Sequence, residues 1–494
     1  MQHIKTLSFL NSNCGKYKSV SVSFSDEEND LYDIVSRMTS TEIRQIIGVD
    51  DINVLIKIAE KDYRNVSQTI KLLLLKSFKK NDSFISSSDV TFRNSKSIPF
   101  QRWYPYIEGY SPNFVKGLIH KYITKNCIIY EPFAGTGTTL FASDNLGYNT
   151  FYSEVNPLLR LLIEVKLDVL SLSISDRRLL SKKIKEIISK VLKFSSPCKT
   201  ELLLNYKKTF GNSCYFPKNN FKQILSTASY IETIEDKLLS DLVKIAALAS
   251  LIPSSFLKKQ GDLRFKTDKE LQSGVEEFGK ILKQNLSVII EDLDQSNYMI
   301  FQNHQCIVEN AKYIGNCKCG KIGAVITSPP YLNGTNYVRN TKLELWFMGI
   351  LKSKNDLRIL RDKMLTSGIN DVRAEYVTNN IVSGKSLLYD STIKQLKESA
   401  YDKRIPIMAQ SYFSEMFEIF DSLKEKLSDK ATIFIDIGDS IFNNVHIRTD
   451  DILIELLENI GYTFKGKEKL RERRSKNGQI LSQTLLKLEY GKIL

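Results

Sequence analysis

Long apolar runs are missing from this sequence. The longest, such as the four leucines at 72–75, are far too short to cross a bilayer, which needs about 20 apolar residues. The first residues, MQHIKTLSFLNSNCGKYK, lack the apolar segment and the small-residue cleavage site of a secretory signal peptide. The sequence therefore predicts a cytoplasmic protein with no membrane partner.

Cysteine is also sparse, and its seven copies do not form a disulfide pattern. Only Cys317 and Cys319 lie close together. A structural zinc ion needs four ligands, usually two such pairs or one pair with histidines. The prediction is therefore reduced thiols, as in a cytosolic protein, and no metal.

Acidic residues are outnumbered by basic ones, 56 against 70, which gives a formal net charge of +14. Such an excess favours a polyanionic partner, nucleic acid foremost. Charge alone is equally typical of a lysine-rich protein that is merely well solvated. The length of 494 residues exceeds what one hydrophobic core usually organises, so we expect two or three units.

The first two segments differ in their hydrophobic pattern. Residues 1–95 carry apolar side chains three and four positions apart, broken at Gly48. This spacing predicts a helical N-terminal unit of unknown role. Residues 96–169 contain two short β-rich runs, CIIYEPF and NTFYSEV, on either side of a helical stretch. This β-turn-α-β pattern predicts the opening of an α/β, doubly wound parallel sheet.

The remaining two segments complete the predicted architecture. Residues 170–300 are long and mainly helical in pattern, and we interpret them as an insertion. Residues 301–494 supply further strands in QCIVENA, AVITSPP and ATIFIDIGDS, then a helix at 452–462. The closing sequences LRERRSKN and LSQTLLKLEY predict a C-terminal β-hairpin.

The segment EPFAGTGTT at 131–139 carries the first chemical signal. Gly135 and Gly137 let a strand turn sharply into a helix and let the backbone approach a ligand. Glu154 follows Gly135 by 19 positions, where a carboxylate binds ribose hydroxyls in nucleotide-type sites. The third glycine of a dinucleotide fingerprint is absent, which disfavours NAD.

The segment TSPPY at 327–331 follows an apolar strand and carries the second signal. Two prolines stiffen the backbone and donate no hydrogen bonds, so nearby carbonyls stay available as acceptors. An aromatic exocyclic amine is a poor nucleophile, and acceptors against its N–H groups favour a reactive geometry. Ser328 and the carbonyl of Pro329 are such acceptors, Pro330 completes the rigid pair, and Tyr331 can stack an extruded base.

Together, FAGTGTT and TSPPY resemble the motifs of the amino-methylating DNA methyltransferases. TSPPY is similar to their cytosine-N4 branch, whereas the adenine-N6 branch usually has Asp or Asn at the position of Ser328. The resemblance implies a Rossmann-like methyltransferase sheet and S-adenosylmethionine as cofactor. It also implies double-stranded DNA as substrate, within a restriction–modification system whose endonuclease acts separately.

The resemblance also implies further cofactor contacts. Tyr110 and Ser111 lie in a segment similar to the one flanking the methionine end of the cofactor. Asn310 stands where the family usually has an Asp near the adenine, and Glu131 likewise replaces a more usual Asp. The predicted cofactor-binding residues are Tyr110, Ser111, Glu131, Phe133, Gly135, Thr136, Gly137, Glu154 and Asn310.

Two basic clusters are candidate DNA contacts, because cations beside aromatics suit phosphate binding and stacking. One lies in the insertion, the candidate target recognition domain, and the other lies in the C-terminal hairpin. A solvated charged surface would have the same composition, and 351–405 is a further basic stretch. The predicted DNA-binding residues are Lys258, Lys259, Arg264, Lys266, Arg471, Arg473, Arg474 and Lys476.

Three other functions stay open. An adenine-N6 DNA methyltransferase or an RNA amino-methyltransferase would use the same two motifs. A catalytically inactive nucleic-acid-binding protein could keep the fold, although the intact motifs argue against it.

Overall fold

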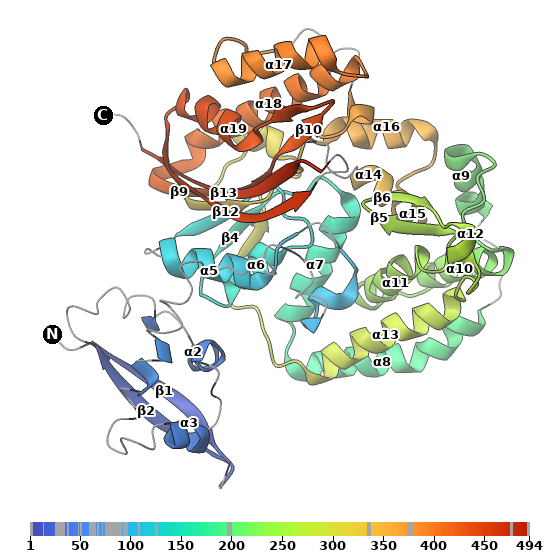
Figure 1. Ribbon diagram of the computed structural model, residues 1–494. Coiled ribbons are helices and arrows are strands. Elements are labelled where there is room, and N and C mark those ends of the chain that lie inside the picture. Colours follow the sequence, from blue (N-terminus) through green and yellow to red (C-terminus); the bar gives the residue numbers. More distant parts are fainter. Residues whose placement is uncertain are drawn as a thin grey trace. The chain divides into compact units, whose positions relative to one another are not determined.

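The computed structural model divides the chain into two compact units, one formed by residues 1–90 with 113–126 and the other by the rest. The described residues are 3–12, 14–24, 35–36, 39–47, 49, 52–58, 66, 69–71, 73–74, 91, 97–106, 109–123, 127–194, 200–332, 337–372, 380–474 and 478–491. The ribbon in Figure 1 follows the chain from blue to red.

The first unit begins with an antiparallel hairpin, which the prediction of a helical unit missed. Strands β1 (His3–Asn11) and β2 (Lys16–Phe24) pair along their full length. Their inner face, with Leu7, Phe9 and Val22, is buried. Alternating apolar residues over so short a span give a weak signal beside the helical pattern that follows. The helices described in this unit are α2 (Ser40–Ile47), α3 (Ile52–Ile58) and α5 (Pro112–Tyr122).

The second unit is built on a seven-stranded sheet in the order β12-β13-β9-β8-β3-β4-β7. Its five strands from β9 to β7 are parallel, and β12 and β13 continue it as an antiparallel hairpin. This confirms the predicted doubly wound sheet and C-terminal hairpin. The strands are β3 (Ile128–Glu131), β4 (Thr150–Tyr152), β7 (His304–Cys306), β8 (Ile322–Thr327), β9 (Leu427–Gly438), β12 (Tyr462–Arg474) and β13 (Ile480–Tyr490).

Helices cover both faces of this sheet (Figure 1). One face packs against α17 (Leu387–Ser399), α18 (Arg404–Leu423) and α19 (Thr449–Glu458) in a single hydrophobic core. The other face is covered by α6 (Thr138–Asp144) and α7 (Pro157–Ser171). A parallel sheet buried on both faces needs strands that are apolar throughout, which explains the unbroken runs CIIY and AVIT.

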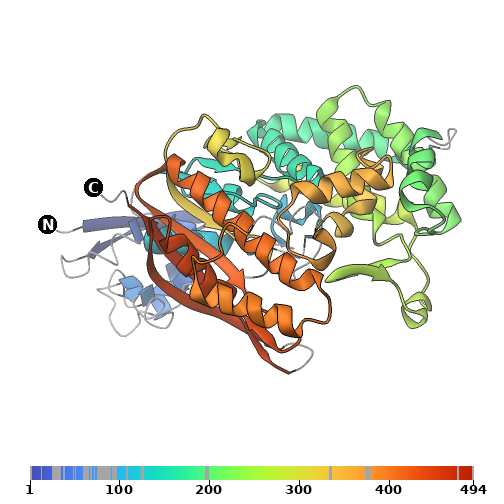
Figure 2. The same cartoon turned by 90° about the horizontal axis from the view of Figure 1, so that it is seen from above.

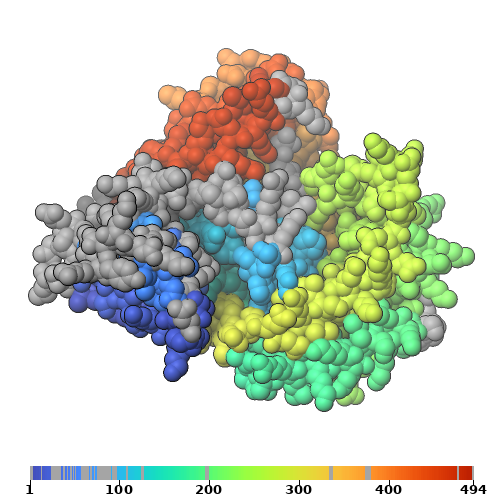
Figure 3. Space-filling model, turned by 60° about the horizontal axis from the view of Figure 1, so that its bottom comes forward, coloured from blue at the N-terminus to red at the C-terminus, as the bar shows by residue number. Residues whose placement is uncertain are grey.

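The insertion is mainly helical, as predicted. Its helices α8 and α13 run side by side across the face shown in Figure 3. Trp346, which lies outside the predicted boundary, is fully buried against this layer, and its indole N–H donates to the carbonyl of Leu202 at 3.0 Å. The helices are α8 (Ile174–Lys193), α9 (Thr200–Phe210), α10 (Lys218–Glu232), α11 (Lys237–Leu251), α12 (Asp268–Leu271) and α13 (Phe278–Gln295), joined by α15 (Lys342–Phe347) and α16 (Lys354–Lys363).

The basic cluster of the insertion forms a small hairpin. Strands β5 (Leu257–Gln260) and β6 (Asp262–Phe265) pair across Gly261, whose φ of +72° suits glycine. Figure 2 shows this hairpin extending from the helices of the insertion. The amide of Asn340, in α14 (Tyr337–Asn340), bonds to Gly261 and Leu263 and fixes its orientation.

The remaining described elements are short. They are the strand pair β10 (Ser440–Phe442) and β11 (Val445–Ile447), and the 3-10 helices η3 (Gln101–Trp103), η4 (Ala311–Asn316), η5 (Ile369–Asp371) and η7 (Lys424–Lys426). Within the described residues, no helix is both long and apolar enough to traverse a bilayer.

Candidate active site

A pocket opens at the carboxyl ends of the parallel strands, where ligands bind in open α/β sheets. Its empty volume is about 1030 Å³ including the open mouth. The predicted cofactor turn after β3 (residues 131–139), Glu154 after β4 and the TSPPY loop after β8 all reach it. The predicted site residues that line it are Tyr110, Phe133, Gly135, Thr136, Glu154, Asn310, Ser328 and Pro330.

The cofactor turn has the backbone that its glycines predict. Gly135 and Gly137 have φ values of +56° and +86°, in the left-handed region that favours glycine. A Cβ on Gly137 would stand 2.9 Å from the ring of Phe141, so this glycine is needed where α6 begins. Gly135 faces the pocket, whereas Gly137 packs behind it.

Glu154 is buried at the end of β4, and its carboxylate is held by the turn itself. One oxygen accepts from the N–H of Gly135 at 2.8 Å, and the other accepts from the N–H of Asn156 at 2.7 Å. Burial raises the pKa of Glu154 to about 7. Each carboxylate oxygen keeps a second acceptor position, so the ionised group can also accept from ribose hydroxyls.

Glu131 does not line the pocket; it joins the predicted cofactor turn to the TSPPY loop. Its carboxylate accepts from the hydroxyls of Tyr110 and Thr139, from Thr327 at 2.6 Å and from the N–H of Phe133 at 3.1 Å. Thr327 directly precedes Ser328, so one buried carboxyl links β3 to the TSPPY loop. Burial raises the pKa of Glu131 to about 7.

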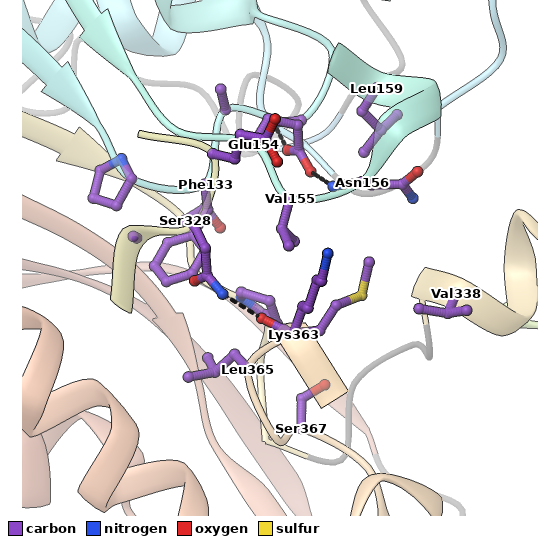
Figure 4. Close-up of a pocket in the computed structure, with 18 of the residues that line it drawn as sticks. Phe133, Glu154, Val155, Asn156, Leu159, Ser328, Val338, Lys363, Leu365 and Ser367 are labelled. Atoms are coloured by element: carbon purple, nitrogen blue, oxygen red, sulfur yellow. Dashed lines mark hydrogen bonds between the residues drawn. The ribbon is translucent and has the colours of Figure 1, made fainter. Parts of the chain in front are cut away.

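Asn310 reaches the pocket, but protein groups use its side chain. Its oxygen accepts from the N–H of Lys312, and its amide nitrogen donates to the carbonyl of Lys363 at 2.7 Å. This holds the end of α16 against the pocket. Figure 4 shows Lys363 extending between Val155 on one wall and Leu365 on the other. Sequence analysis did not identify residues 361–371 as part of this wall, because no motif marks them.

The TSPPY loop, the predicted catalytic loop, lies near a buried carboxyl group that sequence analysis did not single out. Asp436, on β9, is buried, and the nearby hydroxyls of Tyr331 and Ser328 favour the charged form of its carboxylate. These two hydroxyl oxygens lie 3.4 Å apart. Burial raises the pKa of Asp436 to about 6, although its hydrogen bonds favour the charged form. The sequence does carry one signal for this residue, because an aspartate is unexpected inside the otherwise apolar run ATIFIDIG.

Tyr331 lies directly against β9. A Cβ on Gly438 would stand 2.8 Å from its Cδ2 and 3.0 Å from its Cε2, so only glycine permits this approach. The backbone of β9 therefore fixes the ring. Ser111, Glu131, Gly137, Pro329 and Tyr331 are predicted site residues that do not line the main pocket.

The predicted DNA contacts on the β5–β6 hairpin already have partners within the protein. Lys258 and Arg264 both pair with Glu270, at 2.6 Å and 2.8 Å. Lys266 donates to the carbonyl of Ser255 at 2.8 Å. The ammonium of Lys259 lies 5.6 Å from the centre of the Tyr104 ring.

The predicted contacts on the C-terminal hairpin lie on the edge strand β12. Arg471, Arg473 and Arg474 are exposed, and Arg473 reaches the carbonyl of Asp439 at 3.5 Å. Lys476 lies outside the described residues. Arg471 is close enough to Asp436 for its charge to favour the carboxylate.

The described cysteines are free thiols, and the sulfurs of Cys317 and Cys319 lie 3.2 Å apart. In the part of the chain that the structure describes, no group of three or more His, Cys, Asp or Glu side chains is arranged to hold a metal ion.

The parallel sheet, the pocket at its carboxyl edge and the C-terminal antiparallel hairpin define a Rossmann-like methyltransferase fold. The chain is 27% identical to the Type II methyltransferase M.AvaI of Nostoc sp. (strain PCC 7120 / SAG 25.82 / UTEX 2576) over 414 residues, which are 76% of this chain and 82% of the relative. M.AvaI of Anabaena variabilis matches equally well. The Type II methyltransferase M.BsoBI of Geobacillus stearothermophilus is 23% identical over 453 residues, 82% of this chain and 85% of the relative. No family model matches the chain.

Proposed function

We propose that the chain is an S-adenosylmethionine-dependent DNA methyltransferase that methylates cytosine N4 in double-stranded DNA. The observation that carries this proposal is the shared pocket, which both the glycine turn with Glu154 and the loop with Ser328 and Pro330 line. The similarity to Type II methyltransferases supports the same class of reaction. A separate restriction endonuclease with the same target sequence is the expected functional partner.

The residues of the pocket fit this cofactor. Gly135 lets the backbone approach a ligand closely, and Glu154 offers acceptor positions for ribose hydroxyls. Phe133 and Val155 add apolar surface. S-adenosylmethionine supplies a methyl group bonded to a positively charged sulfur, so the protein needs only to position the amine in line with it.

The catalytic loop supplies acceptors for the target amine. Ser328 and the carbonyl of Pro329 would face its two N–H groups, and Tyr331 would stack against the extruded base. When the amine nitrogen bonds to the methyl carbon, the carbon–sulfur bond pair stays on sulfur and one N–H proton must leave. That proton would pass from the amine to the hydroxyl of Ser328 as the hydroxyl's own proton passes to the carboxylate of Asp436, whose charged form Tyr331 and Ser328 favour.

DNA would approach from the side of the C-terminal hairpin, because Arg471 lies near Asp436 and is exposed. The β5–β6 hairpin would contribute more weakly, because Glu270 already neutralises part of its charge.

The test is incubation with labelled S-adenosylmethionine and unmethylated bacterial DNA, followed by nucleoside mass spectrometry. We expect N4-methylcytosine. N6-methyladenine would keep the reaction class and overturn the target assignment. Label that enters RNA and not DNA would overturn the substrate, and the absence of any transfer would favour a binding protein.

A further inference from the structure

Strand β13, the last strand in the sequence, places Gln483 near the TSPPY loop. In the register of the sheet, Gln483 on β13 lies opposite Gly438 on β9 and opposite Arg471 on β12. Side chains two residues apart share a face of a strand, so Asp436 lies on the same face as Gly438. Three neighbouring strands therefore bring Arg471, Gln483 and Asp436 into one row that ends at Tyr331.

Within this row, Gln483 makes an unusual pair of contacts. Its amide nitrogen donates to both carboxylate oxygens of Asp436, at 2.8 Å and 2.9 Å. The side chain is only 6% exposed, and its own carbonyl oxygen has no hydrogen-bond partner in the described structure. A buried acceptor without a partner costs free energy, so the side chain is not placed here for stability alone.

The remaining groups that face Asp436 come from several elements. Ser328 and Tyr331 reach it from the loop after β8, and Arg471 acts on it from β12. Tyr110, from the segment before α5, also interacts with it electrostatically. Gln483 is the neutral amide of this set, so replacing it removes two hydrogen bonds without changing the net charge.

From this arrangement we infer that Gln483 is a positioning residue for methyl transfer, which holds the carboxylate of Asp436 ionised and directed toward Ser328 and Tyr331. The inference rests on the proposed function, because Asp436 must be ionised to accept the proton that Ser328 passes on. Hydrogen bonds donated to a carboxylate favour its charged form. Without Gln483, less would oppose the effect of burial on the pKa of Asp436, so Asp436 would stay protonated up to a higher pH.

The experiment compares single-turnover methyl transfer from pH 5 to pH 9 in the parent protein and in Gln483→Met, an unbranched replacement without donors. The parent rate should fall on the acid side near pH 6, where Asp436 takes up its proton. In Gln483→Met this fall should begin roughly one pH unit higher, while the cofactor affinity changes little. Gln305→Met, at an exposed position on the opposite edge strand β7, is the matched control and should leave the profile unchanged.

A second measurement reports on Asp436 itself. The infrared band of its protonated carboxyl group is identified by its loss in Asp436→Asn, and its titration should move to higher pH in Gln483→Met. Gln483→Leu tests the same loss with a different shape and must shift the profile in the same direction. The inference is overturned if neither the acid side of the pH–rate profile nor the infrared titration of Asp436 shifts in the Gln483 variants. A parent protein that methylates no amino group contradicts the proposed function instead, while the infrared titration still decides the role of Gln483.

Discussion

The two halves of the proposed active site, the cofactor half around Gly135 and the catalytic half around Ser328, hold their buried carboxyl groups in different ways. In the cofactor half, Glu154 is bonded by the backbone N–H groups of Gly135 and Asn156. In the catalytic half, Asp436 is bonded by the side chain of Gln483, and the hydroxyls of Tyr331 and Ser328 favour its charged form. The first set lies within 21 positions of chain, whereas the second comes from three distant segments.

On the proposed function, this difference separates cofactor binding from methyl transfer. A carboxylate held by backbone amides keeps its partners whatever the neighbouring side chains are. A carboxylate held by hydroxyls and an amide depends on strand register, and a slip of one residue would turn those side chains to the other face. We therefore expect changes in the cofactor half to abolish binding, and changes in the catalytic half to lower the rate while binding persists.

The largest effect is expected for Gly135→Asp. The new side chain would adopt an unfavourable backbone conformation and bring a second carboxylate beside Glu154, whose oxygen lies 2.8 Å from the nitrogen of residue 135. Cofactor affinity measured by calorimetry should fall at least about 100-fold. Gly147→Asp is the control, because Gly147 also has a positive φ of +82° but has open space around it and does not line the pocket. Retained affinity in Gly135→Asp would contradict the proposed pocket.

Asp436→Asn should lower methyl transfer by about 10²- to 10⁴-fold, the range for losing a general base. Cofactor affinity should stay within about threefold, because Asp436 does not line the cofactor pocket. Single-turnover rates and calorimetry measure the two quantities. Asp429→Asn, an exposed position on the same strand, should leave both unchanged. If Asp436→Asn lowered the cofactor affinity as much as the rate of methyl transfer, the proposed separation of the cofactor half from the catalytic half would be wrong.

Tyr331→Ala should reduce turnover by roughly 5- to 150-fold, which corresponds to the stacking of one base, while the cofactor still binds. Tyr331→Phe keeps the ring against Gly438 and loses only the hydroxyl, which favours the charged form of Asp436. Its rate should therefore lie between those of the parent and Tyr331→Ala. A Phe variant as slow as the Ala variant would place the role in the hydroxyl and not in the ring.

Cofactor affinity without DNA should depend on pH through Glu154. Since its pKa is raised to about 7, its carboxylate is ionised above that pH and protonated below it. Binding should be strongest above pH 7 and weaken by up to about tenfold per pH unit below it. The Glu154→Gln variant should bind the cofactor more weakly, and its affinity should lose this part of the pH dependence. The variant therefore distinguishes Glu154 from Glu131, whose pKa is also about 7. An unaltered pH profile in Glu154→Gln would assign the dependence to another group.

The smallest effect is expected on the β5–β6 hairpin. Arg264→Ala should weaken DNA binding by no more than about fivefold, because an exposed ion pair with Glu270 already satisfies its charge. Arg471→Ala, which removes an exposed arginine near the catalytic loop, should cost more and reduce the salt dependence of binding. Gel-shift titrations at two salt concentrations compare them. The reverse order would make the insertion the principal DNA contact.

Much of the fold could be predicted, because its signals are local. The apolar runs CIIY and AVIT required strands buried on both faces, and the glycines of FAGTGTT required a sharp strand-to-helix turn. The β1–β2 hairpin was missed because strong helical spacing follows it. The packing of Trp346 against the insertion was also missed, because periodicity shows that a face is apolar but not what covers it.

The sequence by itself determined the identity of the two motifs and the positions of Gly135, Glu154 and Ser328, since each depends on residues close in the chain. Only the tertiary structure decided that Glu131 faces away from the pocket and links the two motifs. It also brought Asp436 and Gln483 to Ser328 and Tyr331. The physical reason is that strand order and register bring together residues more than 100 positions apart, and no local pattern encodes that pairing.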